Sequence, residues 1–143
     1  MRKRLEEHGL HDLVQVDSAG THAYHVGNPP DTRSQRVARD RGLDLSRLRA
    51  RQVEPRDFDE FDLILAMDGQ NLEILKQQCP SWHQAKLARL LDYRQAGAEA
   101  DVPDPYYGGP KGFEMVLDLV NEAVDGLIAD LRRQGLGAGR KAP

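Results

Sequence analysis

The chain has 143 residues, of which 39% are hydrophobic and 30% charged, and its formal net charge is −3. This length and composition predict one globular domain, and the weak net charge argues against binding to nucleic acid or to a membrane surface. No apolar run approaches the roughly 20 residues that span a bilayer, and the N-terminal residues lack the apolar stretch of a secretory signal. The single cysteine, Cys79, excludes an internal disulfide and a cysteine-based metal cluster. We therefore expect a cytoplasmic protein that needs no cofactor or metal.

The chain opens with a predicted helix and a predicted strand. Residues 2–8 have the pattern of a short helix that ends at Gly9. Residues 13–17 are apolar at three of five positions and predict a short strand. Small residues follow at 18–21, and a strand that ends in small residues often brings its backbone close to a ligand or a neighbouring loop.

A helix and an arginine-rich stretch come next. Asp31 is a favoured N-cap residue and Gly42 a favoured C-terminal stop, so they predict a helix over residues 32–41. Arginines crowd residues 33–56, and acidic residues among them balance part of the charge. We expect most of this stretch to be a solvated face.

The strongest predicted strand lies between two short predicted helices. Residues 55–61 predict a helix with a proline in its first turn. Residues 63–67 are apolar on both faces, as the central strand of a parallel sheet is. Asp68 follows the strand directly and is placed to cap a helix that includes residues 71–77.

The remaining elements complete an alternating pattern. Residues 86–91 predict a weaker strand, and apolar residues spaced three and four apart predict an amphipathic helix over residues 113–131. The glycine-rich residues 135–143 predict a disordered tail after a domain at residues 1–134. Alternating helices and strands predict an α/β fold with a parallel sheet, in which ligands bind beyond the carboxyl ends of the strands.

A loop at residues 102–109, Val-Pro-Asp-Pro-Tyr-Tyr-Gly-Gly, carries the clearest functional signal. Prolines on both sides of Asp104 restrict the backbone, so this carboxyl lies on a stiffened loop. A carboxylic acid beside Tyr106, Tyr107 and Tyr24 indicates general acid catalysis onto the leaving oxygen of an aryl phosphate ester, with the rings as walls for a flat group. The alternative, a rigid turn with a capping Asp, stays open on residue types alone.

Several separate motifs, in the same order, resemble those of the low-molecular-weight protein tyrosine phosphatases. The resemblance runs from the first residues to about residue 131. It rests on the segments Asp17-Ser18-Ala19-Gly20-Thr21, Ala50-Arg51-Gln52-Val53, Phe61-Asp62-Leu63-Ile64-Leu65-Ala66-Met67-Asp68 and Asp104-Pro105-Tyr106-Tyr107-Gly108, with Tyr24, Val26-Gly27 and Pro29-Pro30-Asp31 between the first two. The implied fold is the flavodoxin-like, three-layer α/β sandwich of that family.

The resemblance also implies a role for each candidate site residue. Asp104 is then the general acid that protonates the tyrosyl oxygen, and afterwards the base that activates water against a phosphocysteine intermediate. Tyr24 and Tyr106 flank the substrate ring, with Tyr107 beside them. Ser18 hydrogen-bonds the phosphate loop and helps to keep the nucleophile a thiolate. The implied substrate is a phosphotyrosine protein or another aryl phosphate.

One departure from the family pattern concerns the nucleophile. Members carry a Cys-x5-Arg phosphate loop near the N-terminus, where loop amides and the Arg hold phosphate and a helix N-terminus favours the thiolate. Here the residue six positions after Cys79 is Ala85, and Pro80 follows the cysteine directly. We expect Cys79 to be a partly buried loop thiol and the chain alone to be inactive. The resemblance also implies that the central strand, which precedes the phosphate loop in the family, is absent here. Three explanations are open: the start codon is misassigned, the gene is a decayed remnant, or the chain is a non-catalytic binder.

Two further functional interpretations remain open. The chain is then either a non-catalytic domain that binds phosphotyrosine or a partner, or a relative of arsenate reductases, which share the fold and the loop nucleophile. The second interpretation calls for additional redox cysteines, and the sequence contains only Cys79.

Overall fold

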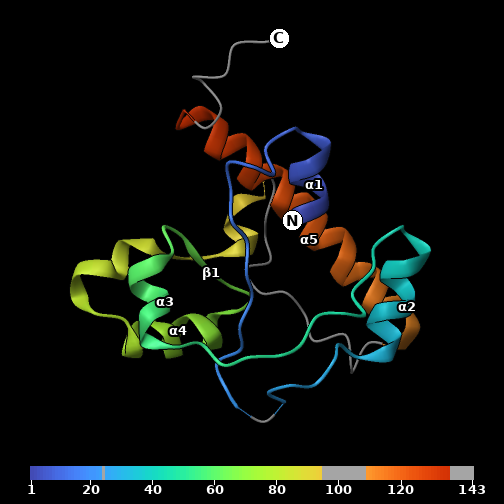
Figure 1. Cartoon of the computed structure of the whole chain (residues 1–143), viewed down its shortest axis with the longest axis horizontal. Helices are drawn as coiled ribbons and strands as arrows, with labels where there is room; N and C mark the ends of the chain where they lie inside the picture. Colours follow the sequence, from blue (N-terminus) through green and yellow to red (C-terminus); the bar gives the residue numbers. More distant parts are fainter. Residues whose placement is uncertain (24, 95–108, 136–143) are drawn as a thin grey trace.

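A computed structural model of the chain describes residues 1–23, 25–94 and 109–135, and its elements largely follow the predicted alternation (Figure 1). The helices and strands, with η for 3-10 helices, are α1 (Arg2–Glu7), α2 (Thr32–Asp40), α3 (Pro55–Glu60), β1 (Ile64–Ala66), α4 (Gly69–Gln78), η1 (Ser81–Lys86), β2 (Leu87–Arg89), η2 (Leu90–Tyr93) and α5 (Gly109–Arg133). The predicted tail from residue 136 onward lies outside the described residues.

A small parallel sheet lies between helices. Strand β1 pairs with β2 in parallel, with Leu65 opposite Ala88. On one face of β1, Ala66 packs with Phe58 of α3 and Leu75 of α4. On the other face, Leu65 packs against the cluster that contains Ala123 of α5. The fold is therefore a three-layer α/β arrangement, and Figure 1 shows α3 and α4 on the opposite side of β1 from α5.

The helices α2 and α4 are capped by the residues that the sequence predicts. The Asp31 carboxylate accepts a hydrogen bond from the Arg33 amide at the start of α2, and Gly42 follows its end with a φ of +81°. The Asp68 carboxylate accepts one from the Asn71 amide at 2.7 Å and caps α4. Each cap satisfies a backbone amide that has no partner within its own helix.

The predictions for residues 13–17 and 90–91 were wrong. No strand forms at 13–17, and this segment runs as irregular chain between α1 and Gly20 (Figure 1). Its amino-acid pattern suits a strand, but a strand also requires a neighbour with which to exchange backbone hydrogen bonds. Within the described residues the sheet contains only β1 and β2. The weaker predicted strand is real but short, because Leu90 and Leu91 turn into η2.

Helix α5 packs very closely on η2. A Cβ atom built on Gly126 would lie 1.9 Å from the backbone oxygen of Tyr93, which only a glycine at this position avoids. Next to this contact, Leu91 and Ala123 are almost fully buried. On another part of α5, Val124 and Ile128 pack against Leu5 of α1. The long helix thus joins the sheet layer to the N-terminal helix.

Candidate functional site

A cavity of about 210 Å³ runs alongside β1. One wall is formed by residues 63–67, which include β1, and the facing wall by residues 17–21. Asp17, Arg51 and Asp57 contribute the charged groups, while most other lining residues are apolar: Val53, Phe61, Leu63, Ile64, Leu65, Ala66, Met67 and Leu75. The cavity therefore lies along the side of the strand and not only beyond its carboxyl end, where the fold class predicts a ligand site.

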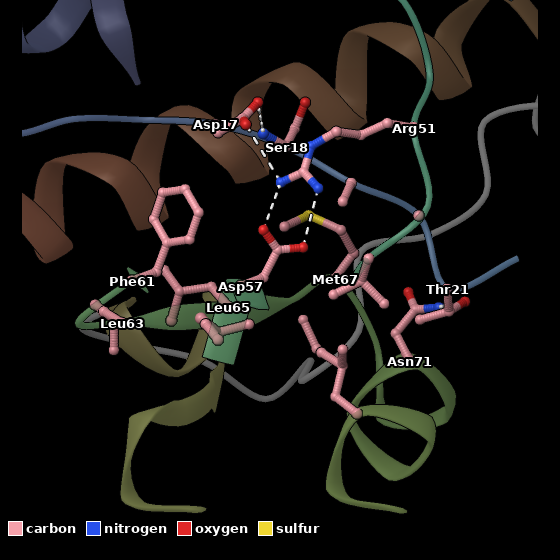
Figure 2. Close-up of a pocket in the computed structure, with 16 residues that line it drawn as sticks. Asp17, Ser18, Thr21, Arg51, Asp57, Phe61, Leu63, Leu65, Met67 and Asn71 are labelled. Atoms are coloured by element: carbon pink, nitrogen blue, oxygen red, sulfur yellow. Dashed lines mark hydrogen bonds and ion pairs between the residues drawn. The ribbon is translucent and has the colours of Figure 1, made fainter. Parts of the chain in front are cut away.

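Arg51 joins two carboxylates at the edge of the cavity. Its Nη1 donates to Asp57 Oδ2 at 2.9 Å and its Nη2 to Asp57 Oδ1 at 3.1 Å. The same Nη2 lies 3.2 Å from Asp17 Oδ2. Figure 2 shows the guanidinium between the two acids. The ion pairs connect residue 17, the segment around residue 51 and helix α3.

The environment of Asp57 favours its charged form. The side chain is only 7% exposed. Burial alone would raise the pKa of Asp57, but the hydrogen bond from Arg51, the amide of Glu54 at 2.8 Å and the positive charge of Arg51 together lower it. The carboxylate in turn raises the pKa of Arg51. Both groups are therefore ionised at neutral pH.

This cluster does not form a phosphate site. One guanidinium faces two carboxylates, so the local charge is negative and repels a phosphate dianion. Both Nη atoms of Arg51 are already engaged by carboxylates. Only Nε is buried without a hydrogen-bond partner in the described part of the chain. The buried donor of Arg51 that has no partner there is therefore Nε, and its surroundings suit a neutral acceptor.

Backbone pairing holds residues 17–21 beside the cavity. Gly20 forms an isolated parallel bridge with Gln52, through the Gly20 amide to the Arg51 oxygen at 2.8 Å and the Val53 amide to the Gly20 oxygen at 2.9 Å. The Asn71 side-chain amide donates to Thr21 Oγ1 at 3.2 Å and ties the same segment to α4. The segment that holds the small residues 18–20 is therefore tied to residues 51–53 and, through Thr21, to α4.

Of the five site residues predicted from the sequence, the structure describes Ser18 alone. Ser18 lies in the cavity wall, exposed, with its amide bonded to the Asp17 carboxylate at 2.8 Å. Asp104, Tyr106, Tyr107 and Tyr24 lie outside the described residues, so their predicted roles stay predictions.

Cys79 lies in the hydrophobic cluster beneath α3 and α4, and not in the cavity wall. It is 7% exposed, and its thiol donates to the Pro80 oxygen at 3.5 Å. Burial raises the pKa of the Cys79 thiol, against a smaller opposing effect of Lys86. A nucleophilic cysteine needs a lowered pKa and access to substrate, so this environment supports the prediction of a structural thiol.

Sequence reasoning missed Arg51 and Asp57, which it assigned to a solvated face. Asp57 is in fact the buried charged residue of the described core. The signal was its place as the third residue of a helix that begins with Pro55, where a carboxylate reaches back to a preceding amide. The adjacent Phe58, 1% exposed, further indicates that this side of α3 faces inward.

Two other kinds of site are not found among the described residues. No three His, Cys, Asp or Glu side chains gather closely enough there to hold a metal ion. No helix in that part of the chain is both long and apolar enough to cross a membrane.

The chain is similar in sequence to known phosphatases. The model of the low molecular weight phosphotyrosine protein phosphatase family matches residues 1–136. A putative low molecular weight protein-tyrosine-phosphatase of Synechocystis is 43% identical over 135 residues, which cover 94% of this chain and 85% of the relative. The corresponding Streptomyces coelicolor protein is 43% identical over 136 residues, covering 93% of this chain and 82% of the relative.

Solved structures give the same result. A protein tyrosine phosphatase from Entamoeba histolytica, crystallised with Hepes in its active site, superposes with a TM-score of 0.89 at 37% identity over 94% of this chain and 86% of that chain. YfkJ from Bacillus subtilis superposes with a TM-score of 0.87 at 36% identity over 94% of this chain and 83% of that chain. The fold is therefore the flavodoxin-like α/β fold of these phosphatases. The chain belongs to the low molecular weight phosphotyrosine protein phosphatase family.

Proposed function

We propose that this chain provides the general acid and the substrate-binding walls of a phosphatase that hydrolyses phosphotyrosine. The observation that carries the proposal is the loop Asp104-Pro105-Tyr106-Tyr107-Gly108, in a chain that the family model matches over residues 1–136. The family is named for phosphotyrosine, and an acid beside aromatic residues suits an aryl phosphate ester.

In the proposed reaction Asp104 acts twice. It first gives its proton to the tyrosyl oxygen as the bond between that oxygen and phosphorus breaks and the phosphoryl group passes to a cysteine thiolate. It then takes a proton from water, whose oxygen attacks phosphorus and releases inorganic phosphate and the thiolate. Tyr24, Tyr106 and Tyr107 hold the aromatic ring, and Ser18 hydrogen-bonds the phosphate loop.

The thiolate and the phosphate-binding Arg are not found among the 143 residues as a Cys-x5-Arg motif. Cys79 does not replace the nucleophile, since it is buried and burial raises its pKa. Arg51 does not replace the Arg, because Asp57 and Asp17 already engage both of its Nη atoms. The proposed reaction therefore needs a Cys-x5-Arg segment in addition to these residues.

The test of the acid uses this chain joined at its N-terminus to a segment that carries Cys-x5-Arg. Replacing a general acid typically slows turnover by about 10²–10⁴-fold, so we expect that loss for Asp104→Asn with phenyl phosphate. The loss should be smaller with a nitrophenyl phosphate, because its leaving oxygen needs less protonation. Asp101→Asn, three positions earlier on the chain, is the matched control. A change of less than about threefold for Asp104→Asn would rule out the role of Asp104.

The lack of Cys-x5-Arg in these residues also favours a second candidate, a domain that binds phosphotyrosine without hydrolysing it. Titration of the chain with a phosphotyrosine peptide and with its unphosphorylated form separates the two functions. Micromolar affinity that depends on the phosphate supports the binding domain, whereas equal or undetectable binding of both peptides rejects it.

A further inference from the structure

The arginines of residues 33–56 fall into two groups. One group forms ion pairs with carboxylates and consists of Arg33, Arg41, Arg51 and Arg56. The other group is exposed, forms no ion pair with a described residue, and consists of Arg36, Arg39, Arg47 and Arg49. We call this second group the basic surface. Its charges are available to a partner, because no carboxylate of the described residues engages them.

Helix α2 presents two of these arginines to solvent. Its other side carries the buried Ala38, and Arg41 at its end pairs with Glu114 of α5, so this side faces the protein (Figure 1). Arg36 and Arg39 are three positions apart on the exposed side and are therefore neighbours on one face of the helix. Like charges at neighbouring positions repel each other, and an anion bound beside them would relieve that repulsion.

The turn after α2 brings the other two arginines to the same place. The Asp44 carboxylate accepts a hydrogen bond from the Ser46 amide at 2.9 Å. Hydrogen bonds from Ser46 lower the pKa of Asp44, and the positive charges of Arg47 and Arg39 lower it further. Both guanidinium groups therefore act on this one carboxylate, one from the turn and one from the helix. Arg49 joins the same turn, since its Nη1 donates to the Ser46 oxygen at 2.7 Å.

Nearby carboxylates offset only part of this positive charge. Residues 32–50 contain six arginines and two aspartates, a net charge of +4 in a chain whose net charge is −3. At Arg49, Nη1 holds the turn, while Nε and Nη2 have no partner among the described residues. A guanidinium donates two parallel hydrogen bonds to a carboxylate from such an edge. The basic surface thus combines excess positive charge with donors that match carboxylates.

We propose that the basic surface binds an acidic segment of another polypeptide, whose Asp and Glu side chains pair with its guanidinium groups. Because each guanidinium can hold one carboxylate by two hydrogen bonds, a segment with about four carboxylates fits best. Hydrogen bonds within the turn already fix its backbone, so binding has little of this chain to order. This binding goes beyond the proposed catalytic role and depends neither on Asp104 nor on a phosphate loop.

Nucleic acid and a second copy of the chain fit this surface less well. Residues 25–53 contain no Phe, Trp or Tyr on which a base could stack, and the net charge of −3 repels a long polyanion. A second copy would have to supply carboxylates, but several of its exposed ones already pair with its own arginines, among them Asp118, Glu122 and Asp125. A separate acidic segment binds without breaking such pairs.

The probe is a fluorescein-labelled peptide of alternating glutamate and serine, and its control has glutamine in place of every glutamate. Fluorescence anisotropy at about 0.1 M salt should show saturable binding of the acidic peptide to the full chain, and the glutamine peptide should bind at least about tenfold more weakly. Equal binding of the two peptides would overturn the proposal. Tighter binding of a labelled oligothymidylate of the same charge would show a nucleic acid site and would also overturn it.

Two double variants of equal net charge test the location. Arg39→Gln with Arg47→Gln changes the basic surface, and we expect it to weaken binding of the acidic peptide by about fivefold or more. Arg56→Gln with Arg133→Gln is the matched control on α3 and α5, where both side chains are 70% exposed, and it should change binding by less than about twofold.

Melting curves check that both double variants fold. Equal effects of the two on peptide binding would contradict the assigned surface. Self-association of the chain that the acidic peptide cannot reverse, together with no peptide binding, would show that a second copy occupies the surface and would overturn the proposal.

Discussion

Arg51 and Asp57 form a bidentate ion pair at the edge of the cavity, with Nη to Oδ distances of 2.9 and 3.1 Å. The acid is almost fully buried and the arginine is 31% exposed, so water screens the pair only partly. Because Arg51 also reaches Asp17, the pair fixes the segment that leads to Ser18. This contact links the stability of α3 to the geometry of the candidate site.

Loss of the Asp57 charge should destabilise the fold. Asp57→Asn removes the charge that offsets Arg51 and leaves buried donors poorly matched, so we expect a loss of about 1–3 kcal/mol in the free energy of unfolding. Urea denaturation measures it. Glu60→Gln, at an exposed position of the same helix, should stay within about 0.5 kcal/mol of the parent. A loss no larger than that of the control would show that the ion pair contributes nothing.

The same carboxylate should give stability a dependence on acid pH. The pKa of Asp57 is lower in the folded chain than its ordinary value, so its contribution is present above the unfolded pKa, about 3.9, and is lost as pH falls through the folded pKa. The difference in free energy of unfolding between the parent and Asp57→Asn should therefore shrink below about pH 4. A difference that stays constant down to the lowest pH at which both chains fold would contradict the lowered pKa.

Gly126→Ala should destabilise the chain although it lies inside a helix. Helix propensity alone predicts a gain of about 0.5–1 kcal/mol for this change. The added Cβ would lie 1.9 Å from the Tyr93 oxygen, however, so α5 must move away from η2, which loosens the packing of Ala123 against Leu91. We expect a lower melting temperature, whereas Met115→Ala on the exposed side of α5 should change it little. A higher melting temperature for Gly126→Ala would contradict the close packing.

Cys79 should react slowly with thiol reagents while the chain is folded. Burial both limits access and raises the pKa of the thiol, which reduces the fraction of thiolate. With Ellman's reagent at mildly alkaline pH, we expect a rate at least about tenfold below that of the urea-unfolded chain. A native rate equal to the unfolded rate would show an accessible thiol and would reopen the question of its role.

The elements that the sequence predicts well are those set by local interactions. Asp31 and Asp68 cap helices by bonding to amides two or three positions away, so residue order alone determines them. The strand at 63–67 is likewise found as β1, because its continuous apolar run has few alternatives to burial between layers.

Non-local contacts account for what the sequence did not predict. Residues 13–17 have a strand-like pattern but no strand partner within the described residues, and no local pattern reports a partner. The Arg51–Asp57 pair forms because the Asp57 carboxylate, in the first turn of α3, points back toward the residues that precede the helix. Opposite charges six positions apart occur on solvated surfaces as well, so their spacing alone did not distinguish a buried pair.

In the function proposed above, this chain carries the acid and the substrate walls of a phosphatase but not its nucleophile. The most direct test is turnover of an aryl phosphate by the purified 143-residue chain. We expect no release of phosphate above the buffer rate. Turnover that disappears in Cys79→Ser but persists in Ser81→Ala would contradict it, because Cys79 would then be the nucleophile.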